Sequence, residues 1–258
     1  MPRSVSTVET DVGGQGEGSG ARPDFRLRLF EGFHMEHHGC PVTQQPAAGR
    51  LIAFLCIRGR RSRAEIVGTL WPETLEDKAQ ARLRTLLWRL HRIAPGLLSG
   101  RDTLAIGPAV DTDVANFQTL AWRLVEGGHR RAADRPDAAA LPSPSCVLVG
   151  ELLPGWYDDW VIFERERLRQ LQLHALEALA VRLTAQRRHG EAVEAGLAAV
   201  RMDPLRESAT RVLIEAFLAE SNVAEAMRHF QAFRLQLADE LGLTPTADLE
   251  RLVYRSSS

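Results

Sequence analysis

Four arginines fall between positions 80 and 93, in a stretch that contains no aspartate or glutamate. A guanidinium group donates a fork of hydrogen bonds that fits a phosphate or the O6 and N7 edge of guanine. A cluster of such groups without nearby carboxylates favours a polyanion as its partner. The alternative is a solvated helix surface that is rich in arginine by chance, and this stretch alone does not separate the two.

Apolar residues in the same stretch predict how the arginines are held. The spacing of the apolar residues predicts an α-helix over residues 79–93. The residues that fall on one face of this helix are Leu83, Leu86, Leu87, Leu90 and Ile93. With about 100° of rotation per residue, the other face carries Ala81, Thr85, Trp88 and Arg92, flanked by Arg84 and Arg89, with Arg82 near the apolar edge. A helix that is apolar behind and basic in front suits the major groove of duplex DNA.

The position of each polar side chain suggests what it would touch on DNA. Base edges are the expected partners of the outward-facing residues Arg84, Thr85, Trp88 and Arg92. Phosphates are the expected partners of Arg82, Arg89 and the helix-initiating Arg63, and a hairpin tip brings Arg101 to the minor groove or the backbone. The alternatives left open are that Trp88 packs in the core and that Arg63 and Arg101 are only solvated.

The residues around this helix predict a winged helix-turn-helix with extra N-terminal strands, over residues 24–110. Alternation of apolar and basic residues predicts a strand at 25–30, and helical spacing predicts a helix at 47–58. A second helix at 63–70 begins after Ser62, which forms a capping-box pattern with Glu65, and ends before a proline. After the arginine-rich helix, residues 97–106 predict a β-hairpin.

An acidic segment precedes the arginine-rich helix. Residues 73–78 are expected to form a polar loop, with carboxylates at Glu73, Glu76 and Asp77. Because phosphates would repel these groups, we expect them to face a protein partner. The alternative is a solvated connection between two helices.

The second half of the chain, residues 111–258, predicts an all-α domain. Helical patterns occur at 117–125 and, after a proline-rich connection at 127–145, include a long helix at 163–186. Residues then recur 34 positions apart, the period of tetratricopeptide (TPR) helix pairs: Leu179 and Leu213, Leu183 and Phe217, Ala192 and Ala226, Gly196 and Phe230, Ala199 and Phe233. The expected fold class is mainly α with a small β part, a winged helix followed by TPR-like repeats, after a disordered tail at residues 1–23.

Composition narrows the function classes. Residues 24–110 hold 13 basic and 8 acidic side chains, whereas residues 111–258 hold 17 and 22, which is typical of a nucleic-acid module on a carrier. The three cysteines are scattered and fit reduced thiols. No apolar run is long enough for a membrane span and no apolar signal core begins the chain, so we expect a cytoplasmic protein with no membrane partner.

Several residue groups resemble catalytic or metal sites only weakly. The histidines His34, His37 and His38 lack a carboxylate or cysteine partner at ligand spacing. The adjacent Asp158 and Asp159 lack a partner acid. We therefore expect no enzyme activity, no metal and no cofactor, and we expect the nearby Trp156 and Trp160 to pack in the core.

Motifs along the chain resemble one known family. They are Gly150-Glu-Leu-Leu-Pro-Gly-Trp-Tyr-Asp-Asp-Trp160, Glu164-Arg-Glu-Arg-Leu168, Asp203-Pro-Leu-Arg-Glu-Ser208, Asn222-Val-Ala-Glu-Ala226 and Asp239-Glu-Leu-Gly-Leu-Thr-Pro245, with Leu70-Trp71-Pro72 and residues 83–92 upstream. In these segments the chain resembles the small Streptomyces antibiotic regulatory proteins (SARPs), which combine an OmpR-type winged helix with a bacterial transcriptional activation domain. The resemblance implies sequence-specific DNA binding, and a pair of chains on direct repeats about one helical turn apart.

The same resemblance implies RNA polymerase as a second partner, with its sigma subunit or an alpha C-terminal domain facing the acidic segment. The expected function is that of a transcriptional activator of a secondary-metabolite (antibiotic) pathway, which recruits RNA polymerase to promoters. The alternative from another class is a TPR-based protein-interaction adaptor whose winged helix does not bind DNA. The two differ in salt dependence, because only a protein that contacts several phosphates loses promoter affinity steeply as salt rises.

Overall fold

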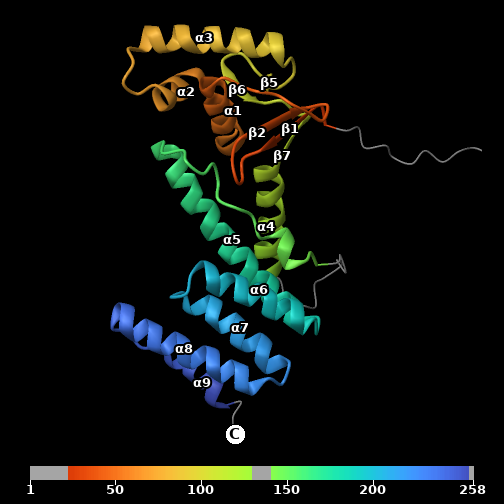
Figure 1. Cartoon of the computed structure of the whole chain (residues 1–258), viewed down its shortest axis with the longest axis vertical. Coiled ribbons are helices and arrows are strands. Elements are labelled where there is room, and N and C mark those ends of the chain that lie inside the picture. The colour runs from red at the N-terminus through yellow and green to blue at the C-terminus, as the bar shows by residue number, and fades with distance from the viewer. Residues whose placement is uncertain (1–22, 130–140, 256–258) are drawn as a thin grey trace, which may run out of the picture.

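The computed structural model describes residues 23–129 and 141–255. In these residues the chain is mainly helical with a small β part, as the sequence predicts. Figure 1 shows an elongated molecule, with helices α1, α2 and α3 and the strands at one end and helices α8 and α9 at the other. The tail expected at residues 1–23 lies outside the described part, apart from Pro23.

A four-stranded sheet opens the described chain. Its order is β3-β2-β1-β7, from β1 (Phe25–Arg28), β2 (His34–His37), β3 (Cys40–Pro41) and β7 (Val110–Thr112). β1 pairs antiparallel with β2 and parallel with β7. Because β7 leads directly into helix α4, the domain border expected between residues 110 and 111 falls inside a strand.

Three helices, α1 (Pro46–Arg58), α2 (Arg63–Leu70) and α3 (Glu76–Ile93), contact one another and form the helix-turn-helix part. The capping box predicted for α2 is confirmed. Ser62 Oγ accepts from the Glu65 amide at 3.2 Å, and the Glu65 carboxylate accepts from the Ser62 amide at 2.9 Å. This reciprocal pair fixes where α2 begins.

Helix α3 begins at Glu76 rather than at residue 79, so the prediction of a loop over 73–78 was wrong for Glu76, Asp77 and Lys78. The reason is electrostatic, because carboxylates in the first turn stabilise the positive end of the helix dipole without adding an apolar period to the sequence. At the other end Ile93 is 57% exposed, so it does not belong to the buried face. That face consists of Ala79, Leu83, Leu86 and Leu90.

The hairpin predicted at 97–106 is confirmed as the wing. Strands β5 (Leu98–Ser99) and β6 (Thr103–Ile106) pair antiparallel, and β4 (Arg61–Ser62) pairs with the other edge of β6. Gly100 has a φ of 99°, and a Cβ there would lie 1.9 Å from the Thr103 carbonyl oxygen, so the turn requires glycine. The β4–β6 pairing joins the start of α2 to the wing.

The second half of the chain is helical. It comprises α4 (Asp113–His129), the 3-10 helix η2 (Pro144–Cys146), α5 (Asp159–Ala185), α6 (His189–Met202), α7 (Glu207–Ala219), α8 (Val223–Leu241) and α9 (Ala247–Arg255). Because α4 continues to His129, the expectation of an irregular connection was wrong for residues 127–129, and residues 130–140 lie outside the described part.

Positions that recur 34 residues apart are buried in both copies. Leu179 and Leu213 belong to the first helix of each pair, and Ala192 and Ala226 to the second; all four are fully buried. Gly196 lets α6 approach α7 closely, because a Cβ at this position would lie 3.0 Å from a Cα of α7. The sequence repeat therefore corresponds to the stacked helix pairs α5–α6 and α7–α8.

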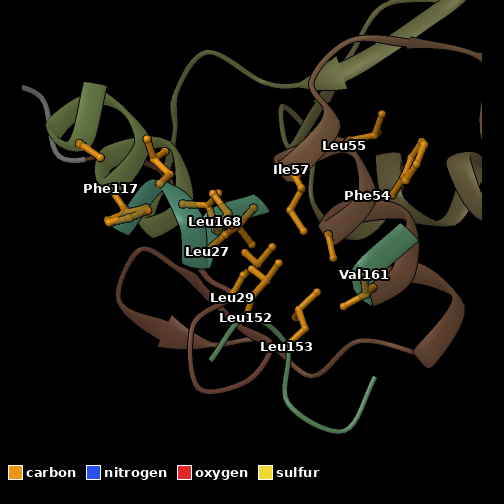
Figure 2. Packing of buried hydrophobic residues seen from close by; sticks show 14 of the residues in the cluster. Leu27, Leu29, Phe54, Leu55, Ile57, Phe117, Leu152, Leu153, Val161 and Leu168 are labelled. Atoms are coloured by element: carbon orange, nitrogen blue, oxygen red, sulfur yellow. The ribbon is translucent and has the colours of Figure 1, made fainter. Parts of the chain in front are cut away.

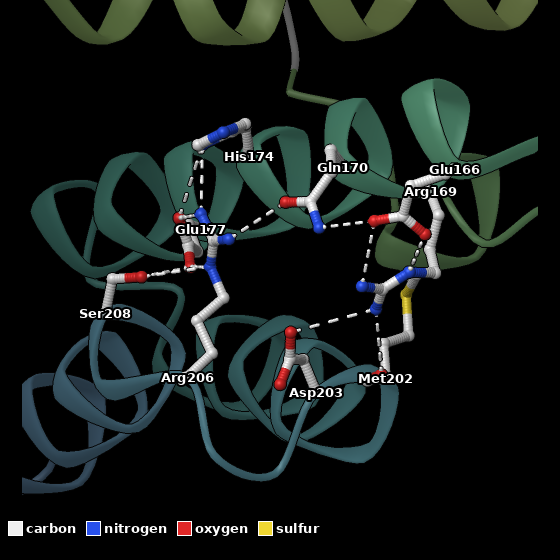
Figure 3. Close-up of polar contacts among 9 residues, drawn as sticks. All are labelled: Glu166, Arg169, Gln170, His174, Glu177, Met202, Asp203, Arg206 and Ser208. Carbon is white, nitrogen blue, oxygen red and sulfur yellow. Dashed lines mark hydrogen bonds and ion pairs between the residues drawn. The ribbon is translucent and has the colours of Figure 1, made fainter. Parts of the chain in front are cut away.

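Polar side chains hold the turn between α6 and α7 against α5, as Figure 3 shows. Arg206 donates from Nε to Glu177 at 2.7 Å. Arg169 on α5 donates to the Met202 carbonyl oxygen at 3.3 Å. The family motif at residues 203–208 thus helps to fix the stacking of the two helix pairs.

The two halves of the chain share one hydrophobic core (Figure 2). A single buried cluster contains Leu27 and Leu29 together with Leu152, Leu153 and Leu168. All five side chains are at most 3% exposed. Separating the halves would therefore expose leucines on both sides, which is unfavourable.

The two tryptophans that were expected to pack in the core do join the halves. Trp160 is 7% exposed, and its ring meets Phe54 of α1 edge-on with 5.3 Å between centroids. Trp156 is half-buried and stacks on Phe33 at 6.1 Å. The prediction of a packing role is confirmed for Trp160, whereas Trp156 packs on Phe33 and stays partly exposed.

Asp113, the first residue of α4, connects the halves through the backbone. Its carboxylate accepts hydrogen bonds from the amides of Leu29 and Phe30 at 2.8 and 3.0 Å. These amides are thereby withdrawn from the sheet ladder, and β1 ends at Arg28 instead of continuing to residue 30. The carboxylate thus aligns α4 with the N-terminal sheet.

Ion pairs between α1 and α5 add to this interface. Glu164 on α5 is 2% exposed and pairs with Arg58 of α1 at 3.1 Å and with Arg167 at 2.6 Å. Arg50 of α1 pairs with Asp158, which precedes α5. Ion pairs near both ends of α1 therefore connect it to α5 and to the residue that precedes α5.

No helix within the described residues is both long and apolar enough to cross a membrane. In the same residues no three His, Cys, Asp or Glu side chains gather as metal ligands. His37 instead stacks on Phe25, with 4.3 Å between ring centroids, and His38 lies 4.2 Å from His37.

Candidate nucleic-acid interface

Helix α3 lies along the outer surface at one end of the molecule (Figure 1). Its buried face packs inward, so its polar face is turned to solvent. The residues of α3 that were assigned to DNA are all exposed: Arg82, Arg84, Thr85, Trp88, Arg89 and Arg92. The geometry that groove binding requires is therefore present, and contact with DNA itself stays a prediction.

Trp88 and Arg92 form one unit on this face. Trp88 is 60% exposed, so the alternative of a core tryptophan is wrong. The Arg92 guanidinium lies over the indole ring, 4.9 Å from its centroid, which restrains both side chains by a cation–π contact. One turn earlier, Thr85 donates its hydroxyl to the Ala81 carbonyl oxygen at 3.0 Å, which leaves its methyl group free for a thymine methyl.

The remaining arginines of α3 make few contacts. Arg82 donates to Thr74 Oγ1 at 3.2 Å, and Arg89 donates to Gln45 Oε1 at 3.3 Å. Arg84 makes no hydrogen bond or ion pair with any residue that the structure describes. Its guanidinium fork is therefore fully available to a ligand.

Arginines without ion pairs are concentrated at this end of the molecule. Within the described ranges, no ion pair is formed by the arginines of α3, the wing turn and the start of α2: Arg60, Arg61, Arg63, Arg82, Arg84, Arg89, Arg92 and Arg101. In the helical half, ion pairs involve Arg165, Arg167, Arg169, Arg188, Arg206, Arg211, Arg228 and Arg251. Positive charge without internal partners attracts phosphates over long range.

The start of α2 and the wing turn form a second basic site. Arg63 donates from Nε to the Arg101 carbonyl oxygen at 2.7 Å, and its amide donates to the Asp102 carbonyl oxygen at 3.2 Å. Arg63 is therefore held by the wing rather than merely solvated. The Arg101 side chain is exposed at the turn, and both interpretations of it stay open.

Arg60 and Arg61 belong to the same site, although the sequence shows them only as a basic turn after a glycine. Arg60 is exposed and donates to Thr103 Oγ1 of the wing at 3.4 Å. Arg61 lies in β4, opposite Leu104 of β6. The pairing of β4 with β6 brings them to the wing, and a two-residue strand leaves no periodic signal in a sequence.

The N-terminal end of α3 carries the acidic residues. Glu73 in the preceding turn and Glu76 and Asp77 in the first turn are all exposed. Leu75 lies among them and is 73% exposed. An apolar side chain surrounded by carboxylates suits a protein surface better than a phosphate backbone.

Comparison with known proteins gives the family. A family model described as the bacterial transcriptional activator domain matches residues 112–255, which is more than half of the chain. The chain belongs to that family. The matched segment begins inside β7 and covers the helical half, whereas helix α3 and the wing precede it.

Two relatives of this bacterial transcriptional activator domain protein are regulatory proteins named AfsR. The protein from Streptomyces coelicolor is 32% identical over 221 residues, which cover 83% of this chain and 22% of the relative. The protein from Streptomyces griseus is 32% identical over 240 residues, which cover 89% and 23%. The expected membership in the SARP family is thus confirmed, and the chain spans less than a quarter of the length of either relative.

A solved structure shares the fold. Mycobacterium tuberculosis EmbR, in complex with a low-affinity phosphopeptide, superposes with a TM-score of 0.72 over 91% of this chain and 65% of its own. The two sequences are 20% identical, so the likeness is one of fold. The prediction of a winged helix followed by a helical domain is confirmed.

Proposed function

We propose that this SARP-family chain is a sequence-specific DNA-binding transcriptional activator whose helix α3 enters the major groove. The observation that carries the proposal is the exposed arginine-rich face of α3, which has no ion pair within the described residues. On this face, Arg84, Thr85, Trp88 and Arg92 read base edges. The flanking Arg82 and Arg89 bind phosphates, and the wing adds Arg63 and Arg101.

A footprint on promoters adjacent to the gene tests this proposal. The protein should protect a defined site, and Arg84→Ala should need a higher protein concentration for the same protection. Arg234 on α8 is exposed and lies at the far end of the molecule, so Arg234→Ala is the matched control and should footprint like the wild type. If no DNA is protected at any salt concentration, the alternative of a helical-repeat adaptor replaces the proposal.

The acidic end of α3 is the proposed contact for RNA polymerase, through its sigma subunit or an alpha C-terminal domain. Support comes from the exposure of Glu73, Glu76, Asp77 and Leu75 beside the groove helix. A bound duplex would hold these residues next to the polymerase without requiring them to touch phosphates. Basic surfaces on the polymerase are the complementary partners.

Neutral variants of similar shape test this contact, because they remove the three charges and keep the size of the side chains. We expect the triple variant Glu73→Gln/Glu76→Gln/Asp77→Asn to keep promoter affinity and to lower transcription with purified polymerase. The control replaces three exposed acids at the far end, Glu220, Asp239 and Glu240, in the same way. Full activation by the first triple variant would mean that polymerase does not contact this end of α3.

Two further parts of the proposal follow from the family. Two chains bind direct repeats about one helical turn apart, so that both lie on one face of the DNA. An insertion of about half a turn between the repeats should abolish cooperative binding, whereas a full-turn insertion should restore part of it.

The protein acts in the cytoplasm of the producing cell, and the genes that it regulates belong to an antibiotic pathway. Loss of the transcripts of these genes in a deletion strain is the test.

A further inference from the structure

A cavity of about 900 Å³ lies between the two halves of the chain. One wall comes from β2 and the segment that leads into α1, and the other from residues 155–158 ahead of α5. Its size lies within the range of about 300–1,000 Å³ that small-molecule sites occupy, and such sites favour domain interfaces. The residues assigned above to DNA and polymerase lie elsewhere.

The cavity has an aromatic wall. Phe33 and Trp156 line it and stack on each other, with 6.1 Å between centroids and 27° between planes. Tyr157 stands at the rim and is 82% exposed. Exposed ring faces on a concave surface suit a ligand that contains a flat ring.

The charged residues of the cavity leave one cation without a partner. Asp158 pairs with Arg50, and Glu36 lies 3.9 Å from Arg26, which Asp111 outside the cavity approaches to 3.5 Å. Arg28 lines the cavity and is exposed, and it forms no ion pair within the part of the chain that the structure describes. Arg28, whose charge also acts on the Asp113 carboxylate, is therefore the group of the cavity that can pair with an anion.

Two hydrogen-bond donors of lining residues are also unmatched. Gln44 Nε2 and Arg50 Nε are buried and have no partner among the described residues. Buried donors normally find an acceptor, because leaving one unpaired is unfavourable. Gln44 Nε2 and Arg50 Nε lie behind the cavity surface, so Arg28 is the unpaired donor that a ligand in the cavity can reach.

We propose that the cavity binds a small organic anion that combines a flat ring with a carboxylate. The ring lies against Trp156, and the carboxylate binds Arg28. Such a ligand touches β2, the start of α1 and the segment ahead of α5 at once, so it stabilises the joint between the halves. The proposal does not depend on DNA binding.

Calorimetric titration with 2-naphthoate tests the site, with the uncharged 2-naphthalenemethanol as the probe of equal ring size. We expect saturable binding of naphthoate that is about tenfold tighter than that of the alcohol, because only the anion forms a charged hydrogen bond with Arg28. Arg28→Gln should remove this preference. Arg234→Gln is the matched control, because Arg234 is an exposed arginine on α8 and lies outside the cavity lining.

Several results overturn the proposal. They are the absence of saturable heat at millimolar naphthoate, equal affinity for both probes, and equal losses in Arg28→Gln and Arg234→Gln. If thermal melting shows that Arg28→Gln is poorly folded, NMR of the wild type decides instead. A Trp156 indole resonance that saturating naphthoate does not shift contradicts the site.

Discussion

Side chains on the outer face of α3 differ in how freely they can meet DNA. Arg84 has no partner within the described residues, whereas Arg92 rests on the Trp88 ring. A bidentate contact with guanine needs the whole fork of the guanidinium. Arg84 can form this contact without rearrangement, whereas Arg92 must move off the Trp88 indole or move together with it. The helical period was enough to predict which residues face outward. It could not predict the Arg89–Gln45 hydrogen bond, which joins residues far apart in the sequence.

This difference gives a prediction about base reading. Arg84→Ala and Arg92→Ala should each weaken specific binding by about 1–3 kcal/mol and relax the preference at one base pair. Arg89→Ala should weaken binding to all sequences alike, because phosphates carry no sequence. Competition titrations with single-base variants of the site measure both effects. Uniform losses for all three variants would mean that α3 does not read bases.

The buried Glu164 gives a prediction about stability. Glu164→Ala leaves Arg58 and Arg167 without their shared carboxylate. Both arginines remain partly exposed, so water offsets some of the loss, and we expect about 2–3 kcal/mol in the free energy of unfolding rather than the larger cost of a fully buried pair. Glu166→Ala is the control and should cost less than about 1 kcal/mol, because Glu166 is exposed. Urea unfolding of the intact chain distinguishes these values.

At the scale of elements, the residues at helix ends determined which helix boundaries the sequence could predict. The start of α2 was predictable because Ser62 and Glu65 satisfy a reciprocal pattern three residues apart. The start of α3 was not, because Leu75 takes the N-cap position without a capping side chain and the first turn is acidic instead of apolar. The strands that complete the wing and the sheet, β4 and β7, are two and three residues long, which is too short for a periodic signal.

The capping box of α2 gives a prediction at this scale. Ser62→Ala should lower stability by about 1 kcal/mol, whereas Ser62→Thr keeps the cap and should cost less. The Ser62 amide and hydroxyl donate to the Glu65 carboxylate and hold its pKa below its usual value. This contribution is complete above the usual pKa of 4.5 and is lost as the pH falls through the lower pKa of the folded state. If thermal melts of Ser62→Ala and wild type differ equally at pH 7 and pH 3, the box does not act in this way.

At the scale of the whole molecule, the two halves behave as one packed body. The sequence indicated two domains with a border at residue 110, and it gave no sign that leucines of the first half are buried by leucines of the second. Hydrophobic periods tell which face of an element is buried but not which partner buries it. The interdomain cavity was unpredictable for the same reason, because its walls come from segments more than 100 residues apart.

The shared core predicts how a truncated chain behaves. A fragment of residues 24–110 lacks most of β7 and the Asp113 carboxylate, and it exposes Leu27, Leu29 and Phe54. We expect it to lose the cooperative thermal transition of the full chain. A fragment of residues 24–129 restores β7 and α4 and should recover only part of it, because α5 is still missing. A sharp transition of the shorter fragment at the melting temperature of the full chain would refute the shared core.

Salt dependence of promoter binding tests the central claim that an uncompensated arginine surface binds DNA. With phosphate contacts from Arg63, Arg82, Arg89 and Arg101, the logarithm of the binding constant should fall against the logarithm of salt with a slope of about −3 to −4 per bound chain. Arg82→Ala/Arg89→Ala should make this slope shallower by about 2, and the control Arg234→Ala should leave it unchanged. A slope near zero, or a slope that the double variant does not change, would contradict the claim.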